Sequence, residues 1–108
     1  YNKNHSRSYI FIDEAIDQII GVSIKSKVKN KTLNIGSQNN LYKNSSLVLK
    51  IKKLMNSNTK IIYKKDNTNS VYFRRPSLKN LKQIYKFTNK KNFTFQLKKT
   101  IEFYAKKK

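Results

Sequence analysis

The chain has 108 residues, of which 37% are hydrophobic, and it carries a net charge of +20 with no cysteine. This length suits one small domain with a modest core, and the absence of cysteine excludes disulfides, zinc–thiolate sites and thiol nucleophiles. No apolar run is long enough to span a membrane, and residues 1–5 lack the apolar core of a secretory signal. We therefore expect a protein of the reducing cytoplasm that has no membrane partner.

The high charge by itself favours a polyanion partner such as nucleic acid. However, 22 of the 25 basic residues are lysine and only three are arginine, while asparagine and isoleucine number 14 and 12. This combination is typical of an AT-rich coding sequence, whereas surfaces that recognise phosphates and bases also use arginine forks. We expect salt-sensitive, non-specific adhesion to nucleic acid, and a small basic nucleic-acid-binding module stays as an alternative function.

The first part of the chain predicts a strand followed by a helix. Residues 9–12 form an apolar run rich in β-forming residues, which indicates a buried strand. Asp13 is then expected to cap a helix that carries Glu14 and Asp17 near its positive end. The apolar face of this helix comprises Ala15, Ile16, Ile19, Ile20 and Ile24.

The middle of the chain predicts two more strands with a helix between them. Residues 32–36 indicate a strand that runs into a glycine turn, and residues 60–63 indicate another short strand. Between them, Ser45 or Ser46 is expected to cap a helix that ends at residues 56–58. The apolar positions of this helix are Leu47, Val48, Ile51, Leu54 and Met55.

Residues 71–80 hold two of the three arginines and the only proline. Pro76 fixes its own φ and favours extended backbone at Arg75. Ser77 is expected to cap a helix whose apolar face is Leu78, Leu81, Ile84 and Tyr85. Arg74 and Arg75 would then precede a helix start, where guanidinium groups and the positive helix end meet an anion together. The alternative is that both arginines are solvated surface residues.

The last part of the chain predicts one more helix. Asn92 is expected to cap it, Phe93 and Tyr104 mark its ends, and residues 105–108 are expected to form a frayed basic tail. The expected order is strand, helix, strand, helix, strand, helix, helix, which indicates an α/β fold. The only glycines are isolated from each other, so the chain has no glycine-rich phosphate loop.

Catalytic groups are scarce. His5 is the only histidine and is expected to be a surface residue near the start of the chain. Three of the five acids fall at a predicted helix start, so no acidic cluster predicts a metal site. The residues thus provide anion-binding groups without a self-sufficient active site. The chain does not begin with methionine, so we expect a piece of a longer protein or a processed product.

Four segments follow a known set of motifs in order. They are RSYIFIDEA at residues 7–15, TLNIGS at 32–37, RRPSLKNL at 74–81 and LKKTIEFY at 97–104. Together they resemble the NAD-dependent nucleotide-sugar epimerase/dehydratase family, the extended short-chain dehydrogenases, and the third segment is nearest to the UDP-glucuronate decarboxylase branch. The chain departs from the family at Ser77, where an aspartate is usual, and at residues 86–87, which are Lys-Phe in place of Gly-Trp.

The resemblance implies that residues 1–108 are a single incomplete α/β domain, the C-terminal substrate-binding part of such an enzyme, with short strands alternating with helices and the Rossmann domain absent. NAD would be the cofactor and would be bound mainly by the missing N-terminal domain, which would also carry the catalytic Tyr-x-x-x-Lys pair. This chain would therefore hold no catalytic residue. A homodimer could form through the missing domain.

The partner implied by the resemblance is a nucleotide-diphosphate sugar. Arg7 matches a family position that contacts the nucleotide diphosphate, and Arg74 matches one that faces the substrate phosphates or the sugar. Arg75, which follows Arg74 directly in the sequence, is the third substrate-binding candidate. A bidentate arginine contact is among the stronger hydrogen bonds to a diphosphate, so two arginines from separate segments would orient the sugar for hydride transfer. A divergent remnant that binds nothing specific is a further alternative.

Overall fold

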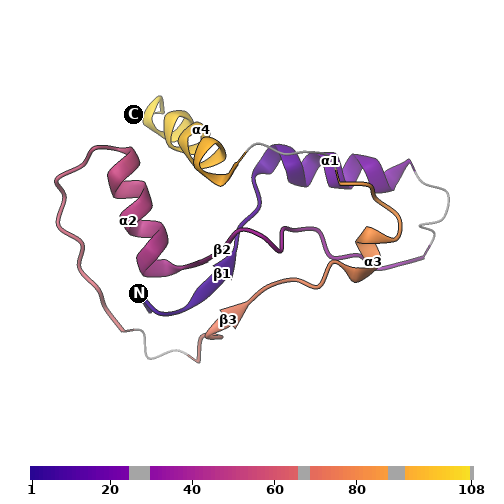
Figure 1. Ribbon diagram of the computed structural model, residues 1–108, viewed down its shortest axis with the longest axis horizontal. Helices are drawn as coiled ribbons and strands as arrows, with labels where there is room; N and C mark the ends of the chain where they lie inside the picture. The colour runs from indigo at the N-terminus through magenta and orange to yellow at the C-terminus, as the bar shows by residue number, and fades with distance from the viewer. Residues whose placement is uncertain (25–29, 66–68, 88–91, 108) are drawn as a thin grey trace. The chain divides into compact units, whose positions relative to one another are not determined.

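The structure is a computed structural model that describes residues 1–24, 30–65, 69–87 and 92–107 (Figure 1). Within these residues the chain forms three strands and four helices, in the order β1 (Ser6–Ser8), α1 (Ile12–Ser23), β2 (Leu41–Lys43), α2 (Asn44–Leu54), β3 (Phe73–Arg74), α3 (Lys79–Lys82) and α4 (Phe93–Ala105). The order of strands and helices agrees with the expected one, and the protein is a small α/β protein.

Backbone contacts divide the chain into two compact units, which are described separately below. Unit 1 comprises Tyr1–Arg7, Tyr42–Arg74 and Lys91–Lys108. Unit 2 comprises Ser8–Leu41 and Arg75–Lys90.

The sheet has the strand order β2-β1-β3, and β1 pairs with β3 in parallel, with Ser6 opposite Phe73 and Arg7 opposite Arg74. The three strand positions predicted from apolar runs, residues 9–12, 32–36 and 60–63, were wrong, because none of these runs forms a strand ladder in the described part of the chain. The strands that do form are only two or three residues long, SRS, LYK and FR, and their partners are distant in sequence. Local β-propensity reports side-chain preference and does not identify the partner of a strand.

In unit 1, the start of α2 is fixed by the segment that precedes β1. The amides of Asn44 and Ser45 donate to the carbonyls of His5 and Lys3, each at 2.9 Å. The helix therefore begins at Asn44 with Lys43 as its N-cap and no side-chain cap bond. The prediction of a Ser45 or Ser46 cap was wrong, because the helix begins before either serine and both lie within its first turn.

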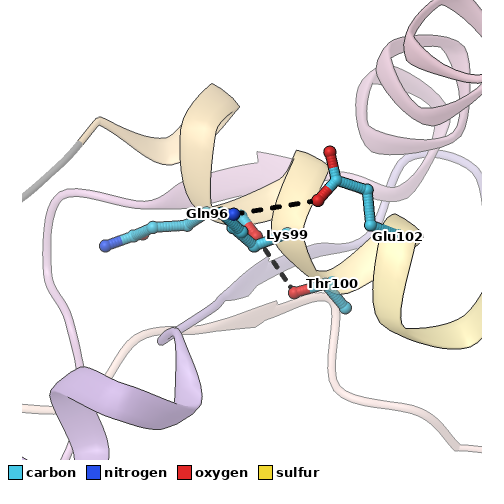
Figure 2. Close-up of polar contacts among 4 residues, drawn as sticks. All are labelled: Gln96, Lys99, Thr100 and Glu102. Atoms are coloured by element: carbon cyan, nitrogen blue, oxygen red, sulfur yellow. Dashed lines mark hydrogen bonds and ion pairs between the residues drawn. The ribbon is translucent and has the colours of Figure 1, made fainter.

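The cap predicted for α4 is confirmed, since Asn92 Oδ1 accepts a hydrogen bond from the amide of Phe95 at 2.9 Å. Near its start, α4 stacks Phe93 on Tyr42 with ring centroids 4.4 Å apart, and α4 packs against α2. Figure 2 shows the polar contacts along α4, where Lys99 Nζ lies 3.9 Å from Glu102 Oε2 and the Thr100 hydroxyl donates to the Gln96 carbonyl at 3.1 Å. The helix ends at Ala105, which was predicted to be the first residue of the frayed tail 105–108. The predicted tail therefore began one residue too early.

In unit 2, the buried centre is small. Its fully buried apolar side chains are Leu78 and Leu81, with 2% and 1% of their surface exposed. Gln18 lies beside Gly36 with no exposed surface, donating from Nε2 to the Gly36 carbonyl and accepting from the Gly36 amide, both at 3.0 Å. This pair of bonds ties α1 to the segment that was expected to be a strand.

The helix expected from residue 78 is shorter than predicted. The helix α3 spans only four residues, and its N-cap is Leu78 with no side-chain cap bond, so the predicted Ser77 cap was wrong. Ile84 and Tyr85 follow the helix, and their amides still donate to the Leu81 carbonyl at 3.0 and 2.8 Å. A helix of this length contributes little to the positive helix end that was expected beside Arg74 and Arg75.

The helix α1 forms where it was predicted, but a different face is buried. Its buried residues are Glu14 and Gln18, whereas the isoleucines of the predicted apolar face are exposed by 44–77% of their surface at Ile16, Ile19, Ile20 and Ile24. The prediction that Asp13 caps this helix was wrong, because the N-cap is Phe11 and Asp13 lies in the first turn. The 3.6-residue periodicity correctly identified isoleucines that share one face of α1. It could not tell whether that face packs against the rest of the chain.

No helix in the described ranges is long and apolar enough to cross a membrane.

Candidate functional site

Two of the three predicted site residues are brought together by the sheet. Arg7 on β1 and Arg74 on β3 are direct register partners in the parallel pair. Side chains of register partners project from the same face of a sheet, on strands about 4.8 Å apart. The two arginine side chains therefore start from neighbouring positions on one face of the sheet, although their segments lie far apart in the sequence.

The Arg7 side chain is oriented by two hydrogen bonds. Nη1 donates to the Ser6 carbonyl at 2.8 Å, and Nη2 donates to the Ser70 hydroxyl at 3.1 Å. The same Ser70 hydroxyl lies 3.4 Å from His5 Nδ1. Arg7 is half-buried while Arg74 is exposed, so the pair combines one fixed guanidinium with one that can adjust to a ligand.

The electrostatics of this pair favour an anion. Across the residues that the structure describes, no carboxylate forms an ion pair with Arg7 or Arg74, and the ion pair found in unit 1 joins Lys99 to Glu102 on α4. Like charges directly opposite each other destabilise a sheet. An anion bound between the two guanidinium groups would remove this repulsion and accept charge-assisted hydrogen bonds from both.

Arg75, the third predicted site residue, is not part of the pairing. It is exposed, it follows the end of β3, and it belongs to unit 2. The arginine pair of unit 1 thus consists of Arg7 and Arg74.

A pocket that was not expected from the sequence lies within unit 1. Its volume is about 540 Å³ and its walls are Asn2, Lys3, Asn4, His5, Tyr63, Lys64, Lys65 and Tyr72. The His5 and Tyr72 rings are 5.2 Å apart at 60°, and Lys3 Nζ lies 5.4 Å from the centroid of the Tyr63 ring. His5 was expected to be a surface residue near the start of the chain, and no local pattern could have revealed its place in this pocket, because three separate segments form the walls.

No glycine-rich loop for the phosphates of NAD occurs in the described residues. Both glycines of the chain serve close packing, since a Cβ atom at Gly36 would lie 2.8 Å from Pro76 Cγ, and one at Gly21 would overlap the ring of Tyr85. Neither glycine therefore belongs to a loop open to a dinucleotide phosphate. In the described part of the chain, no group of three His, Asp or Glu side chains is arranged to hold a metal ion.

The chain matches no protein-family model, no curated protein and no solved structure.

Proposed function

We propose that this chain binds the diphosphate of a nucleotide sugar between Arg7 and Arg74. In this proposal it is the substrate-binding part of an NAD-dependent sugar epimerase, dehydratase or decarboxylase in the cytoplasm. The observation that carries the proposal is the register pairing of the two arginines on parallel strands. Two forks from separate strands constrain a diphosphate in position and in rotation, which a single arginine would not do.

The contribution of this chain to the reaction is positional. Arg7, held by Ser6 and Ser70, fixes one phosphate group, and Arg74 closes on the other from the exposed side. The sugar beyond the diphosphate then has one preferred orientation relative to the hydride acceptor. In this proposal NAD is held by a different domain, which also carries the groups that move protons. The two glycines here pack against Tyr85 and Pro76 and form no phosphate loop.

The exposed face of α1 supports the placement of this chain in a larger enzyme. Four of its isoleucines, Ile12, Ile16, Ile19 and Ile20, are exposed by 44–63% of their surface. Contiguous apolar surface of this kind usually marks contact with other protein. A homodimer is one assembly that would cover it and a second domain is another.

The test is isothermal titration calorimetry, which measures the affinity of UDP-sugars and of inorganic pyrophosphate. Each ligand is titrated into the wild-type chain and into the variants Arg7→Ala and Arg74→Ala. Each substitution is expected to weaken binding about 10- to 100-fold, because it removes hydrogen bonds to a charged group worth about 1.5–3 kcal/mol. Lys53→Ala, which removes an exposed cation from the last turn of α2, is the matched control for net charge. Equal affinity in the wild type and Arg74→Ala would remove Arg74 from the site.

A basic nucleic-acid-binding module is the second candidate, and the exposed tyrosines among lysines at the pocket favour it. Tyr63 and Tyr72 are exposed by 45% and 60% of their surface, and single-stranded nucleic acid binds to such combinations by stacking and charge. This function predicts strong binding of an oligonucleotide with a steep salt dependence and no preference for a sugar diphosphate. Absence of binding to any of these ligands would favour a remnant without a specific ligand.

A further inference from the structure

The pocket and the arginine pair of unit 1 are parts of one surface. Ser70 connects them, because its hydroxyl accepts from Arg7 Nη2 at 3.1 Å and lies 3.4 Å from Nδ1 of the pocket residue His5. On β3 and the residue before it, Tyr72 and Arg74 are separated by one residue, which corresponds to about 7 Å along an extended chain. The aromatic pocket residues His5 and Tyr72 therefore each precede an arginine of the pair, Arg7 and Arg74, by two residues along the chain.

The pocket is also held in shape by the backbone. The Asn2 amide donates to the Lys64 carbonyl, the His5 amide donates to the Asn2 carbonyl, and the Ser6 amide donates to the Tyr72 carbonyl, all at 2.9 Å. Asn2 has a φ of 53°, a left-handed conformation that asparagine tolerates better than most residues. These bonds join the three wall segments before any ligand arrives, so little ordering cost opposes binding.

The chemistry of the walls fits an aromatic ring with polar edges. Tyr72 keeps 60% of its surface exposed while it contacts His5, which leaves ring surface for stacking. The Asn4 side chain offers both a donor and an acceptor, as the edge of a nucleobase requires. The lysine ammonium groups at the rim supply positive charge for a phosphate that follows the ring.

We propose that this pocket binds the base of a nucleoside diphosphate whose phosphates lie between Arg7 and Arg74, with the base stacked against Tyr72. This inference rests on the proposed function and adds the direction of the ligand: the base lies toward the residues before β1 and β3, and the diphosphate lies on the strands. The site thereby selects nucleotides over diphosphates that lack a base.

The experiment compares inorganic pyrophosphate, uridine and UDP as ligands of the wild-type chain, Tyr72→Ala and Tyr72→Phe. UDP is expected to bind wild type at least 10-fold more tightly than pyrophosphate. Tyr72→Ala is expected to weaken UDP about 5- to 100-fold, the range for loss of one base–aromatic stack, with no change for pyrophosphate, and Tyr72→Phe is expected to retain the affinity. The control is Tyr104→Ala, because Tyr104 is equally exposed on α4.

The outcomes separate the two proposals. If pyrophosphate and UDP bind equally well to the wild type, the base pocket is wrong and the arginine site stands. If pyrophosphate does not bind and UDP does not bind, the proposed function fails. A third outcome is that a short oligothymidine binds more tightly than UDP, and that Tyr72→Ala weakens the oligothymidine but not UDP. In that case the pocket binds single-stranded nucleic acid and the inference is overturned. Nuclear Overhauser contacts between the uracil protons of UDP and the Tyr72 ring in the wild type give a readout that needs no variant, and their absence in the saturated complex contradicts the stacking.

Discussion

Gln18 provides the sharpest test of how unit 2 is stabilised. Its amide group forms two reciprocal hydrogen bonds with the backbone of Gly36, both at 3.0 Å, and no part of its side chain is exposed. Replacing Gln18 with Ala removes both bonds and leaves the amide and carbonyl of a buried glycine without them. Each buried backbone group that loses its partner costs about 1–3 kcal/mol.

The expected loss for Gln18→Ala is therefore about 2–5 kcal/mol in the free energy of unfolding. This is a large part of the total for a small domain, which is about 5–15 kcal/mol, and the fully buried apolar side chains among the described residues are only Leu78 and Leu81. Urea unfolding followed by far-UV circular dichroism measures the loss. Gln18→Met keeps the side-chain volume and removes both hydrogen bonds. It therefore separates the destabilisation due to the lost hydrogen bonds from the destabilisation due to the cavity that Gln18→Ala creates.

The neighbouring substitution Asp17→Ala is the control, because Asp17 lies on the exposed side of the same helix. It is expected to change the unfolding free energy by about 0.5 kcal/mol or less. If Gln18→Ala and Gln18→Met both stay within about 0.5 kcal/mol of the wild type, the reciprocal pair does not stabilise unit 2 and the reasoning fails.

Two further predictions concern stability and use thermal unfolding as the measurement. Gly36→Ala should destabilise the protein by about 1–3 kcal/mol through overpacking, because the added Cβ would lie 2.8 Å from the Pro76 ring; an unchanged melting temperature would mean that the ring moves freely. Asn92→Ala should cost about 0.5–2 kcal/mol because it removes the cap bond to the Phe95 amide, and Asn92→Asp should retain most of the stability, so equal losses in both would contradict a capping role.

The amino-acid sequence by itself determined three of the four helices in the described part of the chain. The 3.6-residue period placed α1, α2 and α4 to within a few residues, and Asn92 was identified as the cap of α4. Both features depend on residues within a few positions of one another, so the information is local. The sequence also predicted Arg7 and Arg74 as site residues, through the motifs that they belong to, and their role in binding stays a prediction.

Tertiary structure alone decided the strands, the buried face of α1 and the geometry of the site. The partner of Arg7 is Arg74 because β1 and β3 pair in that register, and no run of apolar residues at 9–12 or 60–63 could specify it. The polar side of α1 is buried because Gln18 finds its hydrogen-bond partners at Gly36. Such pairings join residues far apart in the chain, and their free energy depends on which groups meet after folding, a quantity that no local pattern contains.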